Sequence, residues 1–146
     1  MEITSMTAVD ARELAELDKI CFDIPWSQKS FEDEAGNNLA TYFIAKDNGK
    51  IIGYAGFWSV SGEGDITNVA VLPEYRKKGI ASSLLNSIIK KAAELGLSLL
   101  TLEVRRSNIP AQNLYSKYGF EIIGERKRYY SDNHEDALIM TKKLEM

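Results

Sequence analysis

The sequence holds a single cysteine, Cys21, and a single histidine, His134, among its 146 residues. One cysteine excludes a disulfide within the chain and any cysteine-rich metal site, and it favours a reducing, cytoplasmic location. Cys21 follows the apolar positions Leu14, Leu17 and Ile20 of a predicted helix, where a small core residue is more frequent than a nucleophile. Nothing in the sequence places His134 beside Cys21 or a serine, so a nucleophile–histidine pair is not indicated.

Long apolar runs and an excess of charge are also missing. No stretch reaches the roughly 18 apolar residues of a membrane-spanning helix, and the first residues lack the basic-then-apolar pattern of a signal peptide. The 18 basic and 21 acidic residues give a net charge of −3, which argues against a broad nucleic-acid-binding surface. We therefore predict one domain over residues 1–146, with no metal and no direct nucleic-acid or membrane partner.

The hydrophobic pattern predicts a mixed α/β sheet in the order β-α-α-β-β-β-α-β-α-β-β. Strands are expected at residues 2–6, 41–45, 50–60, 65–71, 97–104, 120–130 and 137–144. Helices are expected at residues 8–21, 28–35, 79–95 and 108–118. Because the strand at 97–104 follows a strand–helix unit, it should lie parallel to the strand at 65–71.

Two small residues, Gly79 and Ala81, stand where the helix at 79–95 begins, directly after the cations Arg76, Lys77 and Lys78. The first N–H groups of a helix have no partner within it, so small side chains there let a phosphate approach them closely. The standard nucleotide loops do not fit, since Lys78 precedes Gly79 rather than following it. The pattern R/Q-x-x-G-x-G/A does fit, and it resembles the acetyl-CoA pyrophosphate loop of the GNAT family of N-acetyltransferases.

Three further motifs strengthen this resemblance. The stretch L-E-V-R-x-S-N-x-x-A-x-x-L-Y-x-x-x-G-F, from Leu102 to Phe120, is similar to the second half of the ribosomal-protein alanine N-acetyltransferases, the RimI type. The segment 25–27 with Phe31 resembles the early substrate-side loop of that subfamily, and Tyr129-Tyr130 followed by residues 135–137 resembles its closing hairpin. The predicted order of elements is also that of the GNAT fold. The one departure in the loop is Ala81, which replaces the more common glycine.

The resemblance implies roles for individual residues. Glu103 matches the general base and Tyr115 the general acid. Acetyl-CoA contacts are implied for Val69, Ala70, Val71, Arg76, Lys77, Lys78, Gly79, Ile80, Ala81, Ser82, Asn108 and Tyr115. Substrate contacts are implied for Ile24, Trp26, Glu103, Tyr129 and Tyr130.

These residue types suit acetyl transfer to an amine. An α-amine has a pKa of about 7.7–8.0, so a carboxylate must remove a proton before the amine can attack the thioester. A strand-end N–H can stabilise the resulting oxyanion, and a tyrosine hydroxyl can protonate the departing thiolate. We expect direct transfer in a ternary complex, in which Cys21 takes no part.

Several alternatives stay open at this stage. Taken alone, Glu103 at a strand end is more often a solvated residue, and Tyr115 at helical spacing is more often part of a core. The loop Ile24–Trp26 could plug the edge of the core or form one wall of a groove. Tyr129 and Tyr130 could line that groove or cap the sheet, and the acidic residues 135 and 136 could be a solvated turn or a site for a basic peptide.

The function itself also has alternatives. The favoured substrate is a protein N-terminus, specifically the N-terminal alanine of a small-subunit ribosomal protein. The enzyme could instead acetylate lysine side chains or a small amine. A third reading is a non-catalytic module that only binds acetyl-CoA.

Overall fold

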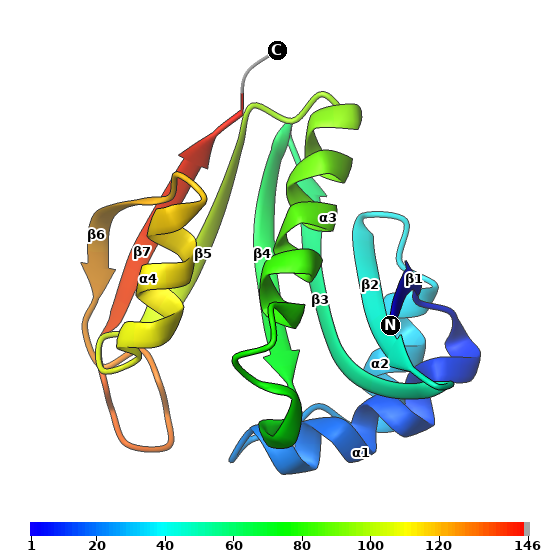
Figure 1. The fold of residues 1–146 in the computed structure, drawn as a ribbon. Helices are drawn as coiled ribbons and strands as arrows, with labels where there is room; N and C mark the ends of the chain where they lie inside the picture. The colour runs from blue at the N-terminus through cyan, green and yellow to red at the C-terminus, as the bar shows by residue number, and fades with distance from the viewer. Residues whose placement is uncertain (145–146) are drawn as a thin grey trace.

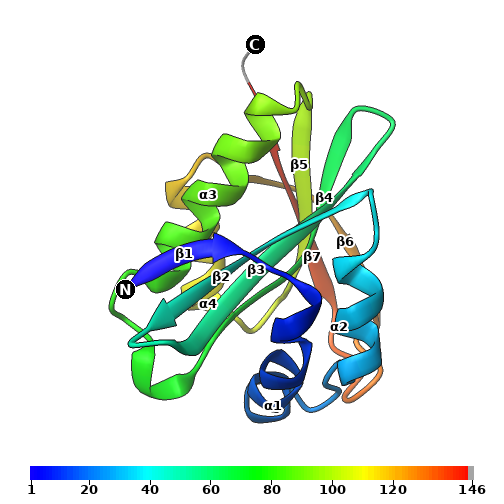
Figure 2. The same cartoon turned by 90° about the vertical axis from the view of Figure 1, so that its right-hand side faces the viewer.

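A seven-stranded sheet with helices on both faces forms the protein in the computed structural model, which describes residues 1–144 (Figures 1 and 2). The strands are β1 (Glu2–Ser5), β2 (Ala40–Asp47), β3 (Lys50–Val60), β4 (Glu63–Val71), β5 (Leu99–Arg105), β6 (Glu121–Arg126) and β7 (Ala137–Lys143). The helices are α1 (Ala11–Cys21), α2 (Gln28–Ala35), α3 (Ile80–Glu94) and α4 (Ile109–Lys117), with 3-10 turns η1 (Ala8–Asp10) and η2 (Pro73–Tyr75). The predicted element order and mixed α/β class are confirmed.

The strands follow the spatial order β1-β2-β3-β4-β5-β7-β6. All neighbouring strands are antiparallel except β4 and β5, which are parallel as predicted. Figure 2 shows α3 on one side of the sheet and α1 with α2 on the other. The helices α1 and α2 lie beside the β2–β3 half of the sheet. They do not cover the face that β5, β7 and β6 form on that side.

Turn chemistry explains the sharpest boundaries. The β2–β3 turn uses Asn48 at φ 51° and Gly49 at φ 81°, and the β3–β4 turn uses Ser61 at φ 52° and Gly62 at φ 79°. Two consecutive left-handed residues match the twist of the flanking strands, and asparagine and glycine adopt this conformation most easily. The helix α2 begins where Ser27 Oγ accepts the Ser30 N–H at 3.1 Å, which confirms the predicted cap.

The first helix differs from the prediction in its start and in its buried face. A 3-10 turn occupies residues 8–10, and Ile20, predicted to face the core, is 63% exposed. The predicted burial of Ile20 is wrong. Ile20 lies about 200° around the helix axis from Asp18, and Asp18 is on the buried face. The buried residues of α1 are Ala11, Leu14, Ala15, Leu17 and Asp18.

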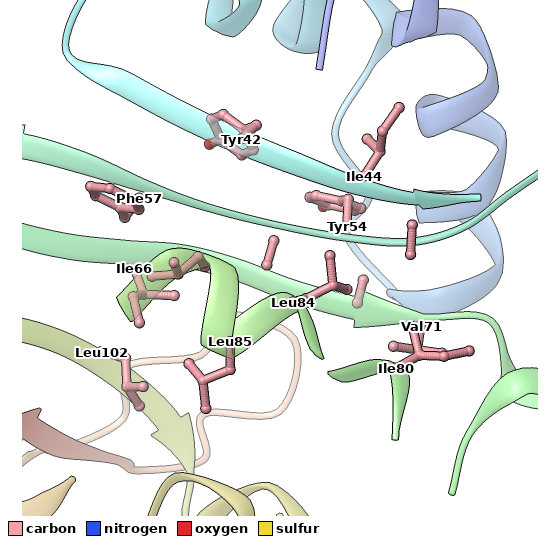
Figure 3. Close-up of a cluster of buried hydrophobic side chains, with 14 of the residues drawn as sticks. Tyr42, Ile44, Tyr54, Phe57, Ile66, Val71, Ile80, Leu84, Leu85 and Leu102 are labelled. Carbon is pink, nitrogen blue, oxygen red and sulfur yellow. The ribbon is translucent and has the colours of Figure 1, made fainter. Parts of the chain in front are cut away.

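The core between α3 and the sheet positions the start of α3. Figure 3 shows Ile80, Leu84 and Leu85 of α3 near Ile66 and Val71 of β4, and all five side chains are buried. Burying such a side chain contributes about 1.5–3 kcal/mol each. This packing holds the N-terminus of α3 beside the end of β4.

The parallel strands β4 and β5 separate along their length. Within residues 1–144 they are joined through two residue pairs, Gly64 with Leu100 and Asp65 with Thr101, although β4 continues to Val71. Figure 1 shows the two strands diverging from the end near the C-terminus towards α1. A bulge at Thr67 accompanies the separation, since Gly56 of β3 pairs with Asn68 whereas the next residue pairs with Ile66.

The last predicted strands are shorter than expected. The strand predicted for 97–104 covers Leu99–Arg105, and the strand predicted for 120–130 ends at Arg126. The chain from 127 to 136 forms a loop that the salt bridges described below hold in place. No helix within residues 1–144 has the length and apolar character needed to cross a membrane.

Candidate active site

A groove of about 710 Å³ lies where β4 and β5 diverge. Its walls come from the loop after α1, from β4, from the end of β5 with α4, and from the loop between β6 and β7. All five predicted substrate-binding residues line it: Ile24, Trp26, Glu103, Tyr129 and Tyr130. Of the predicted acetyl-CoA contacts, Val69, Asn108 and Tyr115 line the same groove.

The loop Ile24–Trp26 serves both roles that the sequence left open. The Trp26 ring packs against Phe31 and Tyr42, with ring centroids 5.3 Å and 6.2 Å away. Trp26 and Ile24 nevertheless line the groove. The loop therefore closes the edge of the core and forms a groove wall at once.

Glu103 reaches the groove because β5 alternates its side chains. Its neighbours Leu102 and Val104 are buried, so Glu103 points to the opposite face of the sheet. Its side chain is 17% exposed, and Oε1 lies 3.3 Å from Nε of Arg126. Partial burial and the charge of Glu103 raise the pKa of nearby Asp65. The carboxylate thus sits at a partly buried position with a cationic partner on β6.

Tyr115 enters from α4 on another side of the groove. It is 8% exposed, and its ring centroid lies 5.8 Å from that of Phe120. Burial, with a smaller contribution from Tyr130, raises the pKa of Tyr115 to about 12. The hydroxyl therefore carries its proton at neutral pH and can donate it.

The separated part of β4 directs backbone groups into the gap. The Leu72 N–H donates to the Ile52 carbonyl of β3 at 2.9 Å. Successive residues of a strand direct their backbone groups to opposite edges, so the N–H groups of Val69 and Val71 face the gap. By the same alternation Ala70, which pairs with Tyr54, directs its backbone to β3. Of the three predicted strand residues, Val69 and Val71 are thus placed to bind a ligand through the backbone.

The loop before α3 contains two residues in the left-handed region. Lys77 and Gly79 adopt φ of 63° and 80°, and Gly79 precedes α3 without a side-chain cap. The side chain of Ile80 is buried, so that residue can contact a ligand only through its backbone. Arg76 makes a hydrogen bond within the protein, in which its Nε donates to the Val71 carbonyl at 2.9 Å. That bond fixes the junction between β4 and the loop.

Asn108 caps α4 as the sequence predicts. Its Oδ1 accepts the Ala111 N–H at 3.2 Å, at a position that also lines the groove. A contact between Asn108 and acetyl-CoA stays a prediction.

The loop from 127 to 136 forms the remaining wall and is fastened by Arg105 at the end of β5. Arg105 binds Asp132 at 2.7 Å and Glu135 at 3.3 Å, and its Cζ lies 4.0 Å from the centroid of the Tyr130 ring. The Ser107 N–H donates to Glu135 Oε2 at 2.7 Å. The contact with Arg105 thereby fixes the Tyr130 ring in the wall of the groove.

The acidic residues of this loop are hydrogen-bonded within the protein. Glu135 is occupied by Arg105 and Ser107, and Asp136 accepts the Arg128 N–H at 2.9 Å. Both carboxylates are thus engaged within the protein, which accounts for these two residues without a peptide ligand. Local sequence could not reveal this arrangement, because the partners are up to 30 residues apart.

Comparison with protein families matches residues 11–120 to the acetyltransferase (GNAT) family. The chain belongs to this family. It is an N-acetyltransferase that uses acetyl-CoA, as GNAT enzymes do.

Similar proteins agree with this assignment along nearly the whole chain. A Bacillus subtilis protein, described as a candidate [ribosomal protein bS18]-alanine N-acetyltransferase, is 40% identical over 94% of this chain and 92% of its own length. The crystal structure of the ribosomal-protein-S18-alanine N-acetyltransferase from Escherichia coli is 32% identical, with a TM-score of 0.91 over 99% of this chain and 94% of that chain. Arabidopsis thaliana NAA60 in complex with acetyl-CoA, at 18% identity and a TM-score of 0.88 over 98% of both chains, shares the fold.

The residues present fit acetyl-CoA as a co-substrate of this GNAT protein. The edge of β4 offers the N–H groups of Val69 and Val71, which suits the amide-bearing pantetheine arm. The uncapped start of α3, with two cations at Lys77 and Lys78, suits a pyrophosphate. At Gly79 a Cβ would meet no atom within 4 Å, but its positive φ would strain any other residue. Within residues 1–144 no cluster of three or more His, Cys, Asp or Glu is arranged to hold a metal ion.

Proposed function

We propose that this protein acetylates the N-terminal amine of a protein, and that its substrate is the N-terminal alanine of ribosomal protein bS18. The observation that carries the proposal is that Glu103 and Tyr115 line one groove beside the gap-facing edge of β4. The substrate follows from the printed activity of the E. coli relative, which is similar over almost all of both chains. A ribosomal-protein substrate would make the cytoplasm the working compartment.

In this proposal the protein residues divide the proton transfers between them. Glu103 accepts a proton from the substrate ammonium group, which releases the lone pair for attack on the thioester carbonyl. The Val69 N–H, which faces the gap, donates to the oxyanion that forms. As the carbon–sulfur bond breaks, Tyr115 gives its proton to the departing thiolate. The nitrogen of the tetrahedral intermediate gives its second proton to the Tyr115 phenolate, and the proton on Glu103 passes to solvent. The products are therefore the amide, the thiol of coenzyme A and one proton, and both side chains return to their starting states.

Cys21 is unsuited to an acyl-enzyme route. Burial raises the pKa of its thiol, and Sγ lies 3.6 Å from the Val71 carbonyl, where it packs against the core. A raised pKa leaves less of the nucleophilic thiolate at neutral pH. This supports direct transfer to the amine.

Two peptides test the proposal when each is incubated with acetyl-CoA and the protein and then weighed by mass spectrometry. One has a free N-terminal alanine and no lysine, and the other has a blocked N-terminus and one internal lysine. Acetylation of the first alone is the expected result. Acetylation of the second alone would contradict the N-terminal assignment and favour lysine side chains, whose pKa of about 10.4 demands more of the base. If neither is modified while acetyl-CoA binds, a small-amine enzyme or a binding module replaces this proposal.

Two variants test the assigned roles on whichever peptide is acetylated. Glu103→Gln should lower the rate about 100-fold, most strongly at the lower end of the pH range, where the amine is protonated. Tyr115→Phe should lower the rate across a wider pH range, because the leaving thiol loses its donor. Glu94→Gln, an exposed change at the end of α3, is the matched control. A pH–rate profile of Glu103→Gln parallel to that of the wild type would remove Glu103 as the base.

A further inference from the structure

Asp18 is the one charged side chain buried within residues 1–144, at 1% exposure, and the proposed chemistry does not use it. A buried carboxylate costs free energy unless its oxygens are hydrogen-bonded, and an apolar residue at this position of α1 would avoid that cost. Both oxygens are in fact bonded. Oδ1 accepts the Tyr54 hydroxyl at 2.6 Å, and Oδ2 accepts the Trp26 N–H at 2.8 Å.

One end of this arrangement anchors the substrate-side loop. The Phe22 N–H donates to the Asp18 carbonyl at 2.9 Å, and the Trp26 N–H donates to its carboxylate. Pro25, between them, has no N–H to offer. The end of α1 holds the chain before Ile24, and the Asp18 carboxylate holds it after Ile24, which lines the groove.

The other end reaches the bulged part of β4. The Tyr54 hydroxyl, which donates to Asp18, also accepts from Nδ2 of Asn68 at 3.0 Å. Asn68 lines the groove and directly precedes Val69, whose N–H faces the gap. The adjacent bulge residue Thr67 is held in a similar way, because its hydroxyl lies 2.8 Å from the hydroxyl of Tyr42.

A continuous chain of hydrogen bonds thus runs beneath the groove, from Trp26 through Asp18 and Tyr54 to Asn68. Tyr54 is 0% exposed, so it cannot touch a substrate and can act only through its partners. Its ring packs among aromatic side chains, with Phe31 at 5.4 Å, so its position is fixed.

We propose that Asp18 and Tyr54 are positioning residues for acetyl transfer. They fix the positions of the substrate-side loop and of the bulged segment of β4 relative to each other. The inference rests on the proposed function, since it concerns the same groove. Asp18 orients the amine-bearing substrate through the Trp26 loop. Tyr54 orients Asn68 and hence the N–H of Val69 that serves the oxyanion.

The polarity of the chain makes Asp18→Asn informative. Both groups that bind Asp18 are donors, and asparagine has only one acceptor oxygen. If that oxygen keeps the Trp26 N–H, its amide must face Tyr54, whose hydroxyl proton then loses its acceptor. In either orientation one donor, the Tyr54 hydroxyl or the Trp26 N–H, loses its acceptor, while the side-chain volume is kept.

Steady-state kinetics of Tyr54→Phe and Asp18→Asn on the alanine peptide test the proposal, with Tyr118→Phe as the matched loss of a hydroxyl outside the groove. Tyr54→Phe should lower kcat about 10-fold and leave the KM for acetyl-CoA within about 3-fold. Asp18→Asn should in addition raise the KM for the peptide. Rates are referred to the folded fraction, measured by circular dichroism. Wild-type kcat in Tyr54→Phe, or an equal loss in Tyr118→Phe, would overturn the proposal.

Tryptophan fluorescence tests the same chain of hydrogen bonds without a measurement of enzyme activity. Trp26 and Trp58 are the only tryptophans of the sequence, so Trp58→Phe leaves Trp26 as the single reporter. In that background Asp18→Asn should shift the Trp26 emission to longer wavelength, as the loop becomes more hydrated. An unchanged emission would overturn the anchoring role of Asp18. If the wild type acetylates neither peptide, the proposed function fails, but this measurement still decides on the anchoring.

Discussion

Two loops line the groove, and they are anchored by different chemistry. The loop 22–27 is held from beneath by Asp18, whose buried carboxylate accepts the Trp26 N–H and whose backbone carbonyl accepts the Phe22 N–H. The loop 127–136 is held from the side by charged groups near the surface, chiefly Arg105, whose side chain is 31% exposed. Buried hydrogen bonds resist salt and solvent, whereas ion pairs near the surface are screened and contribute little free energy. One wall is therefore expected to be rigid and the other adjustable.

The largest expected effect comes from breaking the buried anchor. Asp18→Ala leaves the Tyr54 hydroxyl and the Trp26 N–H buried without an acceptor, which should lower the free energy of unfolding by about 2 kcal/mol. Urea unfolding followed by circular dichroism measures it. Asp33→Ala on α2, whose carboxylate is 65% exposed and pairs with Lys29, should change this free energy by less than about 0.5 kcal/mol. Equal effects in the two variants would refute the contrast between anchors.

The next effect comes from releasing the other wall. Arg105→Ala removes the partner of Asp132, Glu135 and the Tyr130 ring, so the loop should lose its fixed position. We expect the KM for the peptide to rise about 10-fold, with a loss of stability below about 1 kcal/mol. Arg12→Ala on the exposed side of α1 is the control for loss of one cation. A peptide KM unchanged from wild type would show that this loop does not contribute to substrate binding.

Acid should affect the two walls differently. Arg105 lowers the pKa of Asp132, Ser107 lowers that of Glu135, and the Arg128 N–H lowers that of Asp136. The stability that lowered pKa values contribute is present above the ordinary values of about 3.9 and 4.3, and it is lost as the pH falls through the folded-state values. Burial raises the pKa of Asp18, so the folded state binds that proton more readily and acid favours it.

Hydrogen exchange can compare the two anchors directly. Between about pH 6 and pH 3, protection of the Ser107 and Arg128 N–H groups should fall, after correction for the intrinsic exchange rate. Protection of the Trp26 N–H should change much less. Parallel loss of protection at all three sites would indicate global acid unfolding and would contradict the difference between the walls.

The smallest effect is expected at Cys21, beside the buried anchor. Cys21→Ser should leave kcat and both KM values within about 2-fold of wild type, because the thiol only packs against the core and contacts the Val71 carbonyl. The peptide assay measures this. Loss of activity with the fold intact would point instead to an acyl-enzyme route.

Local signals predicted much of the fold. The bounds of β3 and α2 agree with the sequence, because glycine turns and the Ser27 cap mark them. The start of α3 at Ile80 follows in the same way from Gly79. The burial of α1 was harder, since Ile20 is apolar but lies on the exposed side while Asp18 lies on the buried side. The spacing of Asp18 from Leu14, at one helical turn, was the signal that could have identified it.

The site was predicted as a set of residues, and its geometry was not. Glu103, Tyr115 and the aromatic residues could be recognised from motifs, and the structure brings them to one groove. The partners Arg126, Arg105, Tyr54 and Asn68 depend on contacts between distant strands, which no local pattern encodes. The roles of the motif residues stay predictions that the variants above test.

Within residues 1–144, two residue pairs between β4 and β5 are all the strand pairing that joins the two parts of the sheet. One part consists of β1 to β4, and the other consists of β5, β7 and β6. A ligand that lies in the opening and bonds to Val69 acts as a partial extra strand, and it completes a ladder that the polypeptide leaves unfinished. If acetyl-CoA binds Val69 as proposed, it would be a structural component of the sheet for as long as it is bound. Its concentration would then influence the folded fraction of the protein as well as the rate of acetyl transfer.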